Sequence, residues 1–346
     1  MKKTLIASAI AAATFSGSVF AQAQMSASEL AAKMDSMPTI YGNIQYALVH
    51  SDVTGGESEI GHRDNGSTLG VLHDHEIAPG ITGFFKVELE GINADDKAES
   101  SGIDALDEAY IGIEGDSFGQ IWVGSDDSMY ETSIDTIANF YEAADLSIGG
   151  SYETGEGDLI QYMSPSFGGL KLGAAVQVNG DSKTGGKSYP YQLAAIYTMD
   201  ALELAFAMDS NDGNLLYSKD GSPDDDGNPT TSSSNENTYG LRATYSMDNL
   251  SVTGEYQTRK DVGDTVGVQG VYTLGANQFA LSYEMFADDS AAEVDNNTVT
   301  VQALHNVSDH MYVYFEGYLG GGDDGAYGVG DESESSVAAV GAVYYF

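Results

Sequence analysis

Carboxylates recur at every second position of several apolar segments of this chain. In residues 202–206, Glu203 lies on the opposite face from the leucines and the phenylalanine, because successive side chains of a strand point to opposite sides. Acids facing lipid would be destabilising, so the charged face must line water. Rings of acids beside an aqueous path favour cations. The charged positions on such faces are eight acids (Glu88, Glu90, Glu108, Glu114, Glu203, Glu255, Glu284, Glu316) and three bases (Lys86, Lys171, Arg242).

Other reactive residues match no complete site motif. His73 and His75 offer two metal ligands, which is fewer than a protein metal site needs. The acidic runs at residues 224–228 and 323–334 carry oxygen ligands suited to Ca²⁺ or Mg²⁺, without a full EF-hand pattern. Solvated acidic loops, or divalent bridges to lipopolysaccharide phosphates, are the alternatives to a dedicated site, so whether a metal binds stays open.

Linear signatures of catalysis are also missing from the sequence. No nucleophile elbow, P-loop or dinucleotide fingerprint occurs in a fitting context. We therefore expect no cofactor and no enzyme activity. A Ser/His/Asp set assembled across strands, as in a barrel hydrolase, is the remaining catalytic alternative.

The composition narrows the class of protein. Thirteen Lys and Arg against 53 Asp and Glu give a net charge of −40, which argues against nucleic-acid binding. There is no cysteine, so disulfide scaffolds and thiolate metal sites are excluded. Lys2 and Lys3, an apolar run and small residues up to Ala21 predict a secretory signal over residues 1–21. We expect a short tail over residues 22–37 and one barrel domain over residues 38–346.

The rest of the chain alternates strands with two kinds of connection. Seven short turns lie at residues 78–80, 115–119, 164–169, 199–201, 247–249, 275–277 and 307–310. The other, mostly long connections lie at residues 51–66, 93–106, 125–157, 179–188, 211–237, 261–263, 288–296 and 320–335. Seven turns join fourteen strands, and the first and last strands make sixteen. Short turns on one side and long loops on the other indicate an outer-membrane barrel. A soluble β-sandwich is the alternative.

The last segment, residues 335–346, has the pattern of a closing strand. Val340, Ala342, Tyr344 and Phe346 share one face at a period of two. An aromatic residue at the very end suits a membrane interface.

Three stretches resemble the trimeric general porins of Gram-negative outer membranes, with the neisserial and proteobacterial branch as the best match. They are Tyr41-Gly-Asn-Ile-Gln, the run from Tyr110 to Gly119 followed by Trp122-Val-Gly124, and Ser164-Pro-Ser-Phe-Gly-Gly169. The resemblance implies an all-β fold, a 16-stranded antiparallel transmembrane β-barrel with an inward-folded third long loop. It also implies an outer-membrane homotrimer that passes small hydrophilic solutes by passive diffusion, in contact with membrane lipids and lipopolysaccharide.

The third long loop, residues 125–157, would then set the constriction of the channel. Ile134, Ile137, Ala138 and Tyr141 follow helical spacing, and Thr132 with Asp135 predicts a helix cap. A surface helix is the alternative. The loop acids expected on one side of the constriction are Asp126, Asp127, Glu131, Asp135, Glu142 and Asp145.

The facing wall departs from the family pattern. Many members place arginines at positions where this chain has Thr68, Ser125 and Gln161. The predicted wall residues are Lys86, Glu88, Glu90, Glu108, Glu114, Gln161, Arg242, Glu255 and Glu284. Because the acids outnumber the bases, we expect a channel that prefers cations. A sugar-selective channel is the alternative, since Trp122 and inward tyrosines such as Tyr312 and Tyr314 could stack on sugar rings.

Overall fold

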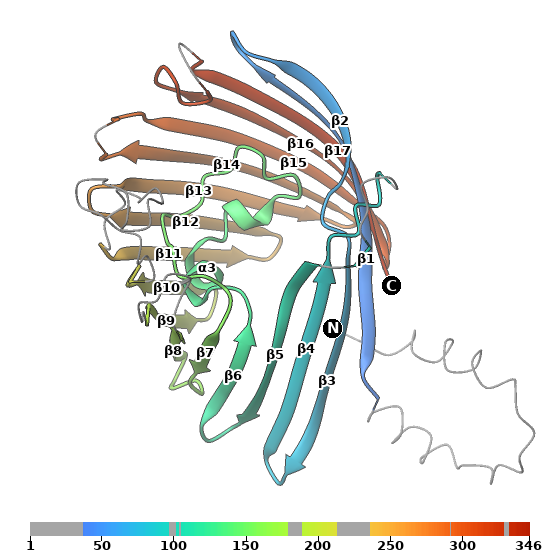
Figure 1. Cartoon of the computed structure of the whole chain (residues 1–346), viewed down its shortest axis with the longest axis vertical. Coiled ribbons are helices and arrows are strands. Elements are labelled where there is room, and N and C mark those ends of the chain that lie inside the picture. The colour runs from blue at the N-terminus through green and yellow to red at the C-terminus, as the bar shows by residue number, and fades with distance from the viewer. Residues whose placement is uncertain are drawn as a thin grey trace, which may run out of the picture.

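The computed structural model describes residues 37–96, 102–103, 105–178, 189–212, 236–290, 292–328 and 332–346. The predicted signal segment and most of the predicted tail lie outside these residues. Antiparallel strands form one closed sheet, the barrel of Figure 1, with the first strand paired to the last. No helix in the described part of the chain is long and apolar enough to cross a membrane.

Seventeen strand segments make up the barrel in the described residues. They are β1 Thr39–Val53, β2 Ser58–Asp64, β3 Thr68–Ala78, β4 Ile81–Glu90, β5 Ala105–Gly115, β6 Gly119–Ser125, β7 Leu159–Met163, β8 Leu170–Gln177, β9 Tyr191–Met199, β10 Leu202–Asp209, β11 Thr238–Met247, β12 Leu250–Arg259, β13 Gly263–Leu274, β14 Asn277–Asp288, β15 Asn296–Ser308, β16 Met311–Gly322 and β17 Glu334–Tyr345.

Two of these segments form one strand of the barrel. β2 and β3 both pair with β1, on either side of a short break at residues 65–67. Gln45 bridges the break, since its backbone nitrogen donates to Ser67 Oγ and its side chain donates to the Gly66 carbonyl. The barrel is therefore sixteen-stranded, as the sequence predicted.

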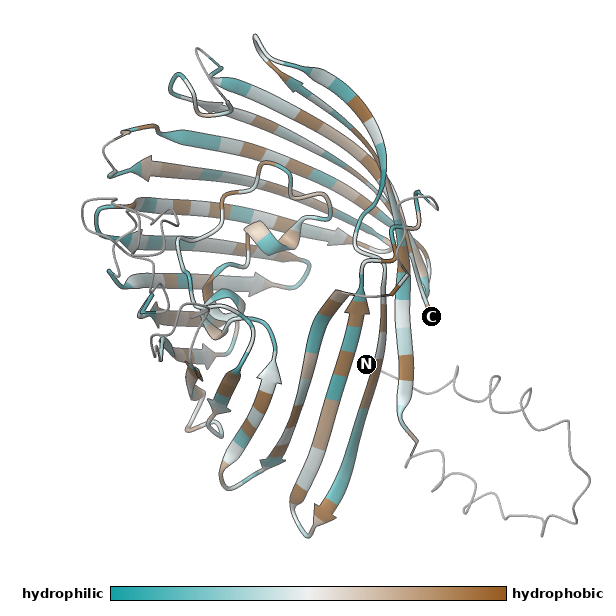
Figure 2. Cartoon of the chain, viewed as in Figure 1, coloured by the Kyte–Doolittle hydropathy of each residue, from teal (hydrophilic) through white to brown (hydrophobic). Residues whose placement is uncertain are grey.

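The predicted assignment of faces is confirmed. Figure 2 shows hydrophilic and hydrophobic residues alternating along the strands. Leu204, Leu241 and Leu281 are about half exposed on the outer surface (41%, 54% and 56%), whereas the neighbouring Glu284 and Glu316 are buried inside the barrel. Every second residue of a strand thus faces the lumen.

The seven predicted short turns all join consecutive strands. The predicted long connection at residues 51–66 is wrong, because β1 and β2 continue through most of it and only residues 54–57 form the turn. These strand ends carry polar residues such as Ser51, Asp52 and Glu59, so the sequence showed no apolar alternation there. Strand ends beyond the lipid layer need no apolar face.

Candidate functional site

The connection from β6 to β7, residues 126–158, folds into the barrel (Figure 1), and we call it the lumen loop. It contains α3, Met129–Ile134, and the short 3₁₀ helix η1, Ala138–Phe140. The predicted cap at Thr132 is wrong. Ser128 caps α3 by accepting the Glu131 amide through Oγ at 3.3 Å, because a serine three residues before a glutamate fits the capping box better.

The apolar side of the lumen loop packs on the inner wall. Ile134 and Ile137 are fully buried, and Tyr141 is 5% exposed. Ile137 and Tyr141 pack with Ala47 and Val49 of β1, among other wall residues. The helical spacing correctly marked the buried side, although a break at residues 135–137 separates α3 from η1.

Wall carboxylates hold the backbone of the lumen loop. Glu255 of β12 accepts the amides of Thr136 and Ile137 at 3.0 and 3.1 Å. Glu284 of β14 accepts the Ile148 amide at 3.2 Å. Glu316 of β16 accepts the amides of Glu142 and Ala143, both at 2.8 Å. Each of these three acids accepts one or two loop amides, so the acids act as tethers.

Three wall arginines hold carbonyl groups of the same loop. Arg63 of β2 donates to the Ala143 carbonyl at 3.4 Å. Arg242 donates to the Ser133 carbonyl at 2.8 Å, near the C-terminal end of α3, where a cation is favourable. It also pairs with Glu203 at 2.8 Å. Arg259 donates to the Ser151 carbonyl at 3.0 Å and pairs with Glu153 at 2.9 Å. Its side chain is 2% exposed, so this arginine is part of the packing.

Several predicted site residues are therefore not on the open channel. Glu255 and Glu284 were expected to line the pore, but they lie between wall and loop, with 8% and 1% of their surface exposed. The inward position of each was correctly predicted. The sequence could not show that a loop segment would cover them.

Three predicted loop acids also have partners away from the opening. Asp135 is 3% exposed and accepts the Gly150 amide and the Gln257 side chain. Glu142 accepts the Tyr312 hydroxyl at 2.7 Å. Asp145 pairs with Arg63 at 2.9 Å. Burial raises the pKa values of Asp135 and Glu142 above their ordinary range.

The inner side of β3, β4, β5 and β6, with the start of β1, faces the lumen loop across the channel, and we call it the open wall. The loop's contacts lie mainly on the other side of the barrel, where α3 packs on β8–β11 and the tethers come from β11, β12, β14 and β16. On the open wall, Lys86 pairs with Glu108 at 2.5 Å and Glu88 at 3.3 Å. Tyr41 of β1 donates its hydroxyl to Glu88 and lies beneath the Lys86 ammonium.

The first residues of the lumen loop add further acids to this region. Asp126 accepts the Trp122 indole at 2.6 Å and the Gln161 amide at 3.1 Å. Burial raises the pKa of Asp126 to about 6; the Trp122 hydrogen bond opposes that rise, and the charge of Glu108 adds to it. Burial also raises the pKa of Asp127, with the charge of Glu131 raising it further and Lys86 lowering it.

The remaining predicted wall positions lie on the same inner surface. Glu90 closes β4 and Glu114 lies near the end of β5, exposed beside the turn at residues 116–118. Thr68 accepts the Asn43 side chain at 3.0 Å, and Ser125 ends β6. These neutral residues occupy positions where arginine was the family expectation.

Sequence reasoning missed several groups that position the loop. Gln192 bonds Ser128 and Asp209 through Nε2 and accepts the Tyr130 amide. The Asp209 carboxylate in turn accepts hydrogen bonds from the Thr154 amide and from the Thr154 hydroxyl. Their inward position on β9 and β10 was the available signal, but a polar inward residue looks the same whether it faces water or a loop.

Metal ligands do not gather in the described part of the chain, where no group of three or more His, Asp or Glu could hold an ion. The acidic run at residues 224–228 lies outside the described residues. Divalent bridging to lipopolysaccharide remains a prediction.

Comparisons with known proteins give the same assignment as the fold. A family model described as Gram-negative porin matches residues 7–346. A monosaccharide porin from Halomonas sp. and the major outer membrane protein of Halomonas elongata are each 31% identical over 306 residues, covering 84% of this chain and 72% of the relative.

Solved porins share the fold at lower identity. An anion-selective porin from Comamonas acidovorans superposes with a TM-score of 0.66 at 18% identity, over 90% of this chain and 99% of the other. OmpF of Salmonella typhi, in complex with daunomycin, gives 0.66 at 15% identity, over 90% and 98%. The closed barrel, the loop folded into it and the match over nearly the whole sequence place this chain in the Gram-negative porin family, as a channel protein of the outer membrane.

Proposed function

We propose that this protein is a general diffusion porin for small hydrophilic solutes and ions and that it prefers cations. The observation that carries the proposal is the charge at the opening between the open wall and the lumen loop. In the described residues, Lys86 lies there among eight carboxylates, namely Glu88, Glu90, Asp107, Glu108, Asp126, Asp127, Glu131 and Glu156. Low-dielectric walls focus such a field on the passage.

Not every inward acid contributes to this cation preference, because the lumen loop covers some of them. Glu255, Glu284 and Glu316 are inward but buried, so a solute does not meet them directly. The bases Arg63, Arg242 and Arg259 are each paired with an acid and donate to loop carbonyls. Selectivity therefore rests on the segment from Asp126 to Glu131 and on the open wall.

Reversal potentials across a planar bilayer with a KCl gradient test the proposal. The purified porin should give a potential of the sign for K⁺ selectivity, and Asp127→Asn with Glu131→Gln should move it toward zero. Asp309→Asn, in the turn between β15 and β16, is the matched control and should leave it unchanged. Anion preference of the unmodified channel would contradict the proposal.

A channel that selects sugars is the second candidate function. The relative named monosaccharide porin favours it, as do the aromatic rings on the inner wall. Tyr314 is a poor candidate for stacking because the ring is 4% exposed, whereas Tyr41, Phe84, Tyr110 and Trp122 keep part of their surface open.

We also propose a homotrimer whose contacts lie on the outer face of β1–β6. From β7 to β14 the outer face carries exposed tyrosines near both rims: Tyr162, Tyr191, Tyr197, Tyr239, Tyr245, Tyr256, Tyr272 and Tyr283. Tyrosine belts mark contact with the lipid interface. On the described outer face of β1–β6 no tyrosine reaches that exposure, and His50, His62, His73 and His75 lie there instead.

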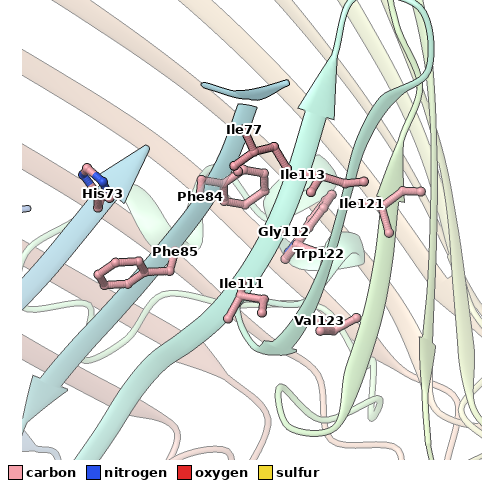
Figure 3. Close-up of a pocket in the computed structure, with 11 residues that line it drawn as sticks. His73, Ile77, Phe84, Phe85, Ile111, Gly112, Ile113, Ile121, Trp122 and Val123 are labelled. Carbon is pink, nitrogen blue, oxygen red and sulfur yellow. The ribbon is translucent and has the colours of Figure 1, made fainter. Parts of the chain in front are cut away.

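An apolar groove on the same face supports contact with a second copy. It is lined by residues of β3–β6, including His73, Phe85, Ile111, Ile121 and Val123 (Figure 3). At Gly83 the groove has no side chain between the larger neighbouring residues. An exposed apolar patch marks an interaction site, and on this face, where no described tyrosine is as exposed as those on β7–β14, we assign it to contact with another subunit.

A further inference from the structure

Three rings on the inside of the barrel lie against glycines of the neighbouring strand. A Cβ on Gly70 would be 2.2 Å from Tyr41 Cζ, and a Cβ on Gly112 would be 2.3 Å from Phe84 Cζ. Each ring and its glycine are direct cross-strand partners. The third pair, Tyr314 and Gly341, is closed off from the lumen, since Tyr314 is 4% exposed. A ring of this kind occupies the space where a side chain would otherwise stand, and Tyr41 and Phe84 both keep part of their surface exposed.

The two uncovered rings belong to the open wall. Tyr41 lies on β1, and Phe84 on β4 packs edge-on against Tyr110 of β5, with centroids 6.3 Å apart. β3 separates β1 from β4, so the two backbones are about 10 Å apart. Lys86, also on the inner face of β4, lies next to Phe84 and has its ammonium 5.9 Å from the Tyr41 ring centroid. The rings are thus spaced along one path on the wall.

Polar groups of both signs lie beside these rings. Lys86 supplies hydrogen-bond donors, and Glu88 and Glu108 supply acceptors. Sugar hydroxyls donate and accept at once, and one face of a pyranose ring presents C–H groups that suit the negative face of an aromatic ring. An organic cation fits less well, since the protein's own ammonium already occupies the position between Tyr41 and the two acids.

We propose that Tyr41 and Phe84, with Lys86, Glu88 and Glu108, form a weak binding site for a monosaccharide ring on the open wall. The inference rests on the second candidate function above, and it adds the location of the site and the chemistry of recognition. The bound sugar stacks on one ring and exchanges hydrogen bonds with the charged triad, so it passes faster than an open-chain solute of equal size.

Uptake into proteoliposomes tests the site with glucose and sorbitol, which match in size but differ in the presence of a ring. Glucose uptake should saturate and exceed that of sorbitol at low concentration. Phe84→Ala should raise the half-saturating glucose concentration roughly two- to tenfold, the worth of one aromatic contact. Phe279→Ala, on the outer face of β14, is the matched control and should behave as the unmodified protein.

Two further readouts separate this proposal from cation preference. The reversal potential should stay the same in Phe84→Ala, which shows that the channel is folded and still selects ions. Tyr41→Phe keeps the ring, so it should retain more sugar preference than Tyr41→Leu. Equal, unsaturated entry of glucose and sorbitol would overturn the sugar site, whatever the ion selectivity. Current block by tetraethylammonium but not by glucose would overturn it in favour of a cation site.

Discussion

Glu316→Gln tests whether buried wall acids hold the lumen loop in place. The Glu316 carboxylate is fully buried and accepts four hydrogen bonds. Two come from the loop amides of Glu142 and Ala143 at 2.8 Å each, and two from Gln302 at 2.8 Å and Tyr318 at 2.9 Å. A glutamine keeps one acceptor oxygen and turns an NH₂ group toward the other pair of donors.

The structure sets the size of the effect. A hydrogen bond to a charged group contributes about 1.5–3 kcal/mol, so loss of two would cost about 3–6 kcal/mol. The Tyr318 hydroxyl can rotate away, whereas the Ala143 amide cannot, which leaves about 3 kcal/mol against the docked loop. The undocked fraction should therefore rise on the order of 100-fold.

Single-channel recordings and amide exchange measure this change. We expect more frequent conductance steps in Glu316→Gln and faster exchange at the amides of Glu142 and Ala143. Glu114→Gln is the matched control, because Glu114 is an exposed inward acid on β5, for which the described structure gives no hydrogen bond to the loop. Both variants could instead show the same frequency of conductance steps and the same slow amide exchange as the unmodified porin. That result would contradict the proposed role of the buried acids in holding the lumen loop.

Other expectations follow from particular residues. Cation preference should fall as pH drops from 7 to 5, because the raised pKa of Asp126, about 6, makes that acid neutral in this range; in Asp126→Asn the fall measured by reversal potential should be smaller. Ile111→Trp should weaken the trimer on unheated SDS gels, while Leu281→Trp on the tyrosine-bearing face should not, and equal behaviour would contradict the assigned contact face. Gly341→Val should lower the thermal unfolding midpoint, since its Cβ would meet the Tyr314 ring at 2.3 Å and overpacking costs about 1–3 kcal/mol; an unchanged midpoint would mean that the ring moves freely.

The barrel could be predicted from the sequence because lipid imposes a simple local rule. Each strand that crosses the membrane must turn apolar side chains outward at every second residue, so Glu203, Glu255 and Glu284 were assigned inward correctly from their own neighbours. Short turns with Gly, Pro, Asn or Asp marked the strand boundaries for equally local reasons.

The site could be predicted only in part, because its geometry depends on contacts distant in sequence. Nothing near Glu255 distinguishes an acid that faces water from one that binds the amides of Thr136 and Ile137, more than a hundred residues earlier. The same holds for Arg242, whose partner is the Ser133 carbonyl. The alternation of polar and apolar residues predicts which face of the sheet a side chain lies on, but it does not predict which other segment covers that side chain.

The division of inward acids into two groups explains how a strongly negative chain can keep a stable loop in its channel. Burying Glu316 beneath the loop is favourable only because backbone amides and neighbouring side chains meet both of its oxygens. On the open wall, by contrast, Glu88 and Glu108 stay partly exposed and share Lys86, so we expect them to act on passing solutes. We therefore expect net charge to be a poor measure of ion selectivity in this porin. We expect the few acids left uncovered to determine ion selectivity, and moving the lumen loop to change which acids those are.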